Sequence, residues 1–164
     1  MHRIVAALSL TIGLWSCAQS FDDFRGVPPP PPEPIRDFLI IPGQRIGPIS
    51  VGMTGSSLYK VLGEPNRAST YAANNGRQMQ EVWFGTLYAR LLLQNPARVT
   101  SANTIDPRYA TANGVHVGIS QFGLSALVGP PSMTRGDEWC YSSGMFIEIQ
   151  SGKVTRISVN TPGC

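Results

Sequence analysis

Val51-Gly52-Met53-Thr54 opens a stretch that occurs twice in the chain, and this repetition decides the fold that the sequence predicts. The first copy continues with Leu58, Val61, Leu62, Gly63 and Pro65. The second copy lies 66 positions later and consists of Val117-Gly118-Ile119-Ser120, Leu124, Leu127, Val128, Gly129 and Pro131. A constant offset without a gap indicates a tandem duplication.

Each copy predicts one short helix. Thr54 and Ser120 are typical N-caps, because their hydroxyls can accept a hydrogen bond from a free amide of the first turn. Met53 and Ile119 precede these caps, where each can pack on the leucine four residues into the helix as a hydrophobic staple. The apolar residues of each copy follow at i, i+3 and i+4, which is one face of a helix. The glycine and proline after them predict the helix end.

Short strands are expected around each helix. Apolar or alternating residues predict strands at 38–41, 81–84, 88–93, 99–105, 139–141, 145–150 and 154–159. The polar segment 66–78 is either a loop or contains a weak second helix over 68–73. In the last hairpin, a three-residue loop at 151–153 would set Ile147 opposite Ile157 and Ile149 opposite Thr155. We favour this register over a two-residue turn, which would set Ile147 opposite Arg156.

The first 16 residues are typical of a signal peptide. His2 and Arg3 form a small basic region, and residues 4–15 are an apolar run too short to span a bilayer. The run ends at Cys17 in a sequence that resembles a bacterial lipobox. The resemblance implies that Cys17 is lipidated, and Ala18 after it implies sorting to the outer membrane on its periplasmic side. Because Trp15 departs from the usual small residue, cleavage near Ala18 to a soluble periplasmic or secreted protein is the alternative.

Residues 17–37 then predict a tether between the lipidated cysteine and the folded part. Pro28 to Pro32, followed by Pro34, favour an extended polyproline II segment. A docking motif for a proline-binding partner is the alternative, but no flanking charges specify one. We therefore interpret the segment as a spacer.

The predicted fold class is α+β. Two tandem repeats, 38–110 and 111–164, would each pack a short capped helix, or a helix pair, on an antiparallel β-meander. The helix start Gly52-Met53-Thr54, the helix end Leu62-Gly63 with Pro65, and the Trp83-Phe84 strand behind a lipobox resemble the SmpA/OmlA (BamE) family of outer-membrane lipoproteins. Two such units in tandem are similar to the beta-lactamase inhibitor protein. This resemblance implies an architecture, and neither family's binding residues match here.

Composition and motifs argue against catalysis and nucleic-acid binding. The net charge of +3 is small and dispersed. His116 is the one histidine after the signal segment, and neither a second histidine nor a Gly-x-Ser-x-Gly motif accompanies it. The adjacent Asp137 and Glu138 are typical of a solvated turn rather than of an acid pair. We therefore expect no enzyme activity, no cofactor, no metal site and no small-molecule substrate.

Two cysteines remain if Cys17 carries lipid. In an oxidising periplasm, Cys140 and Cys164 are expected to form a disulfide that ties the last residue to strand 139–141. The competing hypothesis is a nucleophilic Cys140 paired with His116. It lacks the neighbouring Lys or Arg that would lower the pKa of the thiol.

Aromatic residues give the one indication of a binding surface. Trp83, Tyr88, Trp139 and Tyr141 recur in the two repeats, and a sheet face that displays them is a candidate protein-binding patch. Packing in the core is the alternative for the same side chains. The sequence thus predicts a membrane-anchored periplasmic lipoprotein that binds another envelope protein without catalysis. The alternatives are an inhibitor-like module that presents loops such as 72–76 to a periplasmic or secreted enzyme, and an enzyme with a polar cleft that no motif reveals.

Overall fold

Helices α1 (Gly55–Leu62) and α2 (Gln121–Val128) begin at the two copies of the repeated stretch. The Thr54 hydroxyl accepts a hydrogen bond from the amide of Ser57 at 3.2 Å, and the Ser120 hydroxyl accepts one from Gly123 at 3.0 Å. At the other end, Gly63 and Gly129 adopt φ values of 76° and 75°, a conformation that favours glycine. The start and end of both helices are therefore encoded locally.

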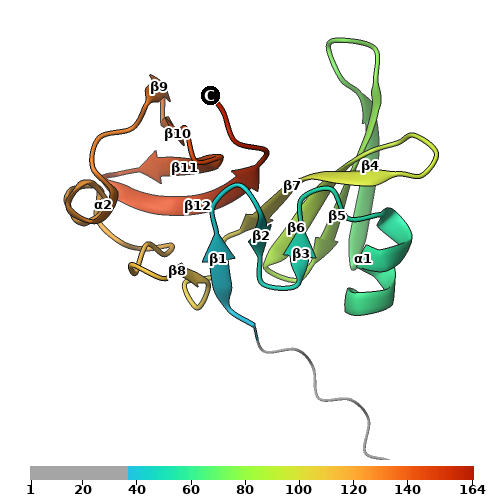
Figure 1. Ribbon diagram of the computed structural model, residues 1–164, viewed down its shortest axis with the longest axis horizontal. Coiled ribbons are helices and arrows are strands. Elements are labelled where there is room, and N and C mark those ends of the chain that lie inside the picture. Colours follow the sequence, from blue (N-terminus) through green and yellow to red (C-terminus); the bar gives the residue numbers. More distant parts are fainter. Residues whose placement is uncertain (1–36) are drawn as a thin grey trace, which may run out of the picture. The chain divides into compact units, whose positions relative to one another are not determined.

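The computed structural model describes residues 37–164 (Figure 1), which belong to one compact unit. The predicted signal peptide, the lipidated Cys17 and the tether up to residue 36 lie outside the described residues.

One large antiparallel sheet contains most of the strands. Its strand order is β4-β5-β6-β7-β12-β11-β10-β9. The bounds are β4 (Arg67–Ala72), β5 (Gln78–Phe84), β6 (Leu87–Leu92), β7 (Arg98–Thr104), β9 (Met133–Arg135), β10 (Glu138–Tyr141), β11 (Met145–Gln150) and β12 (Lys153–Asn160). A smaller sheet has the order β3-β2-β1-β8, with β1 (Leu39–Ile41), β2 (Arg45–Ile46), β3 (Ile49–Ser50) and β8 (Ala110–Thr111).

The predicted α+β class is wrong, because the structure is 46% strand and 12% helix. Each helix is followed by four strands, but the two meanders are not separate layers. Strands β7 and β12 pair and set Asn103 opposite Ser158, so the meanders form one eight-stranded sheet. Segment 66–78 also differs from its prediction, since it contains the edge strand β4. Every residue of β4 is exposed, so the segment lacks the apolar alternation that predicts a strand.

The two copies make matching main-chain contacts. The amide of Gly52 donates to the carbonyl of Val99 at 2.7 Å, and Gly118 donates to Val154 at 2.8 Å. Bulges also occur at matching places, between Arg90 and Leu91 and between Glu148 and Ile149. The two copies of the repeated stretch therefore make the same main-chain contacts with the strands that follow them.

In the last hairpin, the observed strand register differs from the predicted one at one position. Gln150 pairs with Lys153, so the turn contains two residues, Ser151 and Gly152, both with positive φ. The bulge beyond the turn restores the pairing of Ile147 with Ile157, as predicted, but sets Ile149 opposite Val154 instead of Thr155. The sequence prediction had placed in the loop an extra residue that belongs to the bulge.

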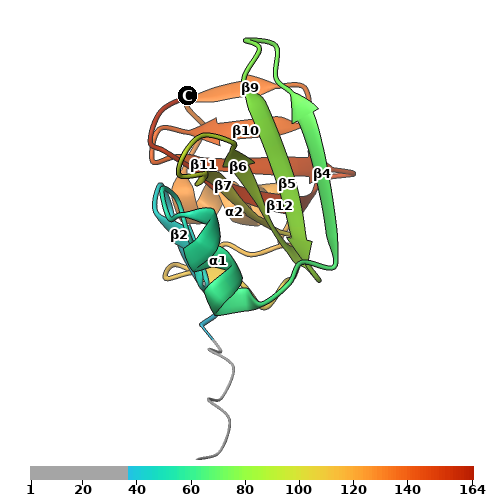
Figure 2. The same ribbon diagram turned by 90° about the vertical axis from the view of Figure 1, so that its right-hand side faces the viewer.

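The core lies on one face of the large sheet. Its strands supply Val82, Leu91, Ile147 and Ile157, which are at most 1% exposed. Buried side chains from both helices and the small sheet join the same cluster, namely Leu58, Leu124, Ile40, Ile46 and Ile49. Figure 2 shows α1 and β2 on the same side of β4 and β5. The helices and the small sheet therefore cover one face of the large sheet.

Candidate functional site

The opposite face of the large sheet is covered by no other described element, and we call it the open face. Alternation along each strand places its side chains opposite to the core. One row of directly opposed residues crosses six strands and consists of Trp83, Tyr88, Asn103, Ser158, Phe146 and Cys140. A neighbouring row consists of Ser69, Glu81, Arg90, Ser101 and Asn160. The open face is therefore polar and aromatic.

Aromatic rings and guanidinium groups stack along the open face. Arg67 on the edge strand β4 lies over the ring of Trp83, 4.9 Å from its centroid. Trp83 stacks on Tyr88 with centroids 5.9 Å apart, and Arg156 of β12 lies 5.9 Å from the Tyr88 ring. Each contact is a cation–π or aromatic pair. The stack joins side chains from four strands, so it exists only when the part of the sheet from β4 to β12 forms.

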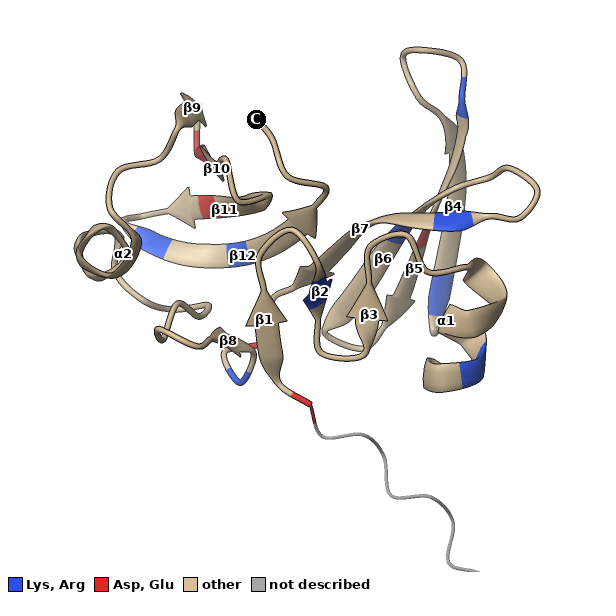
Figure 3. Cartoon of the chain, viewed as in Figure 1, with Lys and Arg blue, Asp and Glu red and all other residues tan. Residues whose placement is uncertain are grey.

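Two ion pairs flank this stack. Arg90 Nη2 lies 2.8 Å from Glu81 Oε1, and Arg156 Nη1 lies 3.0 Å from Glu148 Oε2. In each pair the partners lie on neighbouring strands, with Arg156 on β12 and Glu148 on β11 (Figure 3). All four side chains are partly exposed, so we expect each pair to contribute about 1 kcal/mol or less to stability.

The open face contains two hollows. The central hollow has a volume of about 210 Å³, and Tyr88, Asn103, Glu138, Phe146 and Asn160 are among its lining residues. Asn103 and Ser101 in its lining are 3% and 5% exposed although no element covers this face. The Ser101 hydroxyl donates to Asn103 Oδ1 at 3.3 Å, and Asn103 Nδ2 donates to the Tyr88 carbonyl at 3.4 Å. Burial raises the pKa of the Tyr88 phenol.

The second hollow, which we call the hairpin hollow, has a volume of about 290 Å³. Tyr71 of β4, Met79 of β5 and Leu92 of β6 give it an apolar lining. Arg90 lines both hollows, so they adjoin on the open face. A partner that covered this face would meet an apolar depression beside a polar one.

The four aromatic residues selected from the sequence lie on two different faces of the large sheet. Trp83 and Tyr88 lie on the open face. Trp139 lies opposite the buried Ile147, and Tyr141 lies opposite the buried Met145, so both point to the core. Val82, opposite Ala89, holds the place of Trp139 in the first copy. The two tryptophans therefore do not correspond, because a shift of one residue moves a side chain to the other face.

The open face also contains residues that the sequence analysis did not select. These are Arg67, Arg90, Asn103, Phe146, Arg156 and Asn160. They come from five strands, β4, β6, β7, β11 and β12, and share no motif, so only the strand register brings them together. Alternation within a single strand shows which residues share a face, but it does not show which strands are neighbours.

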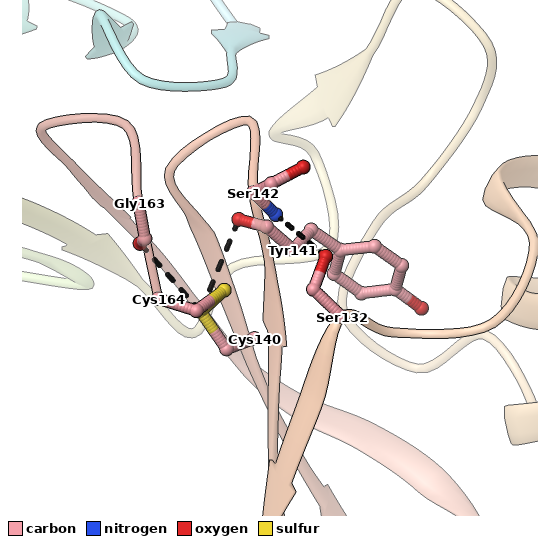
Figure 4. The surroundings of a disulfide bond; sticks show 6 residues. All are labelled: Ser132, Cys140, Tyr141, Ser142, Gly163 and Cys164. Carbon is pink, nitrogen blue, oxygen red and sulfur yellow. Dashed lines mark hydrogen bonds between the residues drawn. A yellow bond between two sulfur atoms is a disulfide. The ribbon is translucent and has the colours of Figure 1, made fainter.

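The two remaining cysteines form a disulfide (Figure 4), and Cys140 belongs to the row of the open face that begins at Trp83. The sulfur atoms of Cys140 and Cys164 are bonded, with a Cα–Cα distance of 5.9 Å. The amide of Gly163 donates to the Ser142 carbonyl at 3.1 Å, and the Ser142 amide donates to the Ser132 hydroxyl at 3.1 Å. The chain end is thereby fixed to β10. Cys140 is not a free thiol in this structure, which leaves no nucleophile for the alternative hypothesis.

Residues 37–164 contain no cluster of three or more His, Cys, Asp or Glu side chains that could hold a metal ion. His116 Nδ1 lies 2.8 Å from the Gly114 carbonyl within its own turn. Asp106 is buried and bonded to Arg108 and Thr86, and the Arg108 guanidinium holds the pKa of this carboxyl far below its usual range. This ion pair fixes a loop before β8. In the described part of the chain, neither helix is long and apolar enough to cross a membrane.

Comparison with known proteins adds little. No protein-family model and no curated protein matches the chain. Among solved structures, the chain is similar to the crystal structure of the uncharacterized protein YfeY from Escherichia coli. The identity is 13% and the TM-score 0.43, and the match covers 73% of this chain and 98% of YfeY. This similarity is too weak to support an argument. The resemblance to the SmpA/OmlA family and to the beta-lactamase inhibitor protein therefore stays a prediction.

Proposed function

We propose that the chain is a non-catalytic protein-binding module of the bacterial cell envelope and that it binds its partner through the open face. The observation that carries this proposal is the difference between the two faces of one sheet. Both helices and the small sheet pack on one face. On the other face the chain end is bonded to Cys140, and no helix of residues 37–164 adds buried side chains there. That face displays stacked aromatic and arginine side chains, which are enriched at protein interfaces.

The envelope location comes from the sequence. The predicted signal peptide and lipobox place Cys17 at an outer-membrane anchor, and the proline-rich segment would separate the folded part from the lipid. The disulfide supports an oxidising compartment. An anchored module with an uncovered sheet face is suited to holding or scaffolding another envelope protein.

An inhibitor-like module is the second candidate. The loop between β4 and β5 favours it, because residues 74–77 are exposed and adjoin the hairpin hollow. Such a loop could enter the cleft of a periplasmic or secreted enzyme. This candidate predicts a soluble partner that binds without the anchor.

Affinity capture of the tagged full-length protein from detergent-solubilised envelope tests the proposal. We expect a partner that is retained by the wild type and lost with Ser69→Arg, which adds bulk at an exposed position of the open face, and with Trp83→Ala. The matched control is Phe122→Ala, because Phe122 is an 85% exposed aromatic residue of α2, outside the open face.

The pattern of loss decides between the candidates. Loss with both open-face variants and retention with Phe122→Ala supports the proposal. A partner retained by both open-face variants would contradict it. A soluble enzyme that is captured equally by Cys17→Ser, and only while the loop 73–77 is intact, would favour the inhibitor instead.

A further inference from the structure

The two edge strands of the large sheet differ in length and in protection. At one edge, β9 has three residues, follows Pro130 and Pro131, and ends at Arg135. At the other edge, β4 has six residues, all of them exposed, and lies beside β5 (Figure 2). Proteins commonly shield sheet edges with short strands, charges or prolines, because the main-chain groups of an edge can pair with another strand. After Arg67, the β4 edge has none of these features.

The hydrogen bonds at the start of the β4–β5 hairpin show which main-chain groups of β4 point outward. The amide of Ala73 donates to the carbonyl of Arg77 at 2.8 Å, and the strand register continues from this pair without a shift. Because hydrogen-bonded positions alternate along an antiparallel pair, the amides and carbonyls of Ala68, Thr70 and Ala72 point away from β5. In the described part of the chain, β4 pairs with β5 alone.

The outward groups are spaced so that they can pair with a second copy of themselves. Ala68 and Ala72 lie at equal distances along the strand on either side of Thr70. If a second copy runs antiparallel with its Thr70 opposite this Thr70, then Ala68 lies opposite Ala72 in both directions. Each outward residue would then exchange both of its main-chain hydrogen bonds with the residue opposite. The edge is therefore complementary to itself about Thr70.

The side chains fit the same pairing. Thr70 would lie opposite its own copy, and threonine pairs across strands are stabilising. On the open face, Ser69 would lie opposite Tyr71, and Arg67 would lie opposite Ala73. No like charges would be directly opposed, which is the arrangement that destabilises antiparallel pairs. A twofold pairing of this kind is closed, and the short β9 strands would be the two edges that remain.

We propose that two copies of the chain associate through antiparallel pairing of β4 with β4 about Thr70, which joins their large sheets. The inference does not rest on the proposed function, because it uses the edge of the sheet and not its open face. The paired strand is short, so we expect a weak dimer whose population rises with protein concentration.

Sedimentation equilibrium of the full-length protein, in detergent of matched density and over a series of concentrations, tests the pairing. We expect the wild type to dimerise and Thr70→Glu to raise the dissociation constant of the dimer about fivefold, because it sets two carboxylates directly opposite each other. An equal mixture of Thr70→Glu and Thr70→Lys should restore association, since the opposed charges then attract.

Thr134→Glu is the matched control for this experiment. Thr134 is an exposed threonine of the other edge strand, β9, so its replacement should leave the dimer unchanged. Thr70 is exposed as well, and its main-chain groups make no bond to β5, so the substitutions there are expected to leave the fold intact. A wild type that stays monomeric at every concentration, or a dimer that Thr70→Glu leaves unchanged, would overturn the inference.

Cysteine crosslinking tests the register of the pairing. Thr70→Cys should form a disulfide between two chains, because directly opposed residues have Cα atoms about 5.5 Å apart. Ala72→Cys is the matched control on the same strand, since it would lie about 13 Å from its own copy. A mixture of Ala68→Cys and Ala72→Cys should crosslink. Equal crosslinking of Thr70→Cys and Ala72→Cys, or a crosslink from Thr70→Cys to a different protein in intact cells, would contradict the proposed pairing.

Discussion

Leu58→Ala and Leu124→Ala are each expected to lower the free energy of unfolding by about 2–5 kcal/mol. Both side chains are fully buried, and each joins its helix to the core side of the large sheet. Removing the leucine leaves a cavity under the helix in addition to the lost burial of apolar surface. Urea denaturation followed by circular dichroism measures the change.

The repeated stretch provides its own controls for this prediction. Val61 and Leu127 belong to the same apolar pattern but are 44% and 41% exposed. Val61→Ala and Leu127→Ala should therefore each cost less than about 1 kcal/mol. If the buried and the exposed truncations cost the same, the helices do not pack on the sheet as described.

Cys164→Ser is expected to lower the free energy of unfolding by about 3 kcal/mol. The bond to Cys140 joins residues 24 positions apart, and its loss frees the unfolded chain from that constraint. Thermal unfolding of the variant and the wild type, with and without dithiothreitol, measures the effect. The reductant should destabilise the wild type to the level of Cys164→Ser.

Cys17→Ser is the control for the disulfide, since Cys17 is expected to carry lipid instead of a disulfide. Its unfolding should match that of the wild type and should respond equally to dithiothreitol. An unfolding free energy of Cys164→Ser within about 1 kcal/mol of the wild type would show that the bond adds little stability.

The helices could be predicted because their signals are local. A cap at Thr54 or Ser120 and a glycine at Gly63 or Gly129 act within one or two turns of the chain. The fold class could not be predicted in the same way. It depends on the pairing of β7 with β12, which joins residues about 55 positions apart and leaves no local signal. Strand β4 was missed because both its faces are exposed.

The residues of the candidate site were even harder to predict from the sequence than the fold class. Trp83 and Tyr88 were selected by residue type, and they stack on each other on the open face. Trp139 was selected by its apparent match to Trp83, but the register places it on the core side. Asn103 and Asn160 line the same hollow only because β7 and β12 are neighbours in the sheet. Residue type can therefore suggest candidates, whereas strand order decides which of them meet.

Site-specific photocrosslinking in intact cells would test whether the open face is the binding surface. A photoreactive amino acid would replace Ser69 or Ser158 on the open face, and Lys60 or Phe122 on the helices of the opposite side. We expect one partner to crosslink at Ser69 and Ser158 and not at Lys60 or Phe122. Crosslinks to that partner at Lys60 and Phe122, with none at the open face, would contradict the proposal.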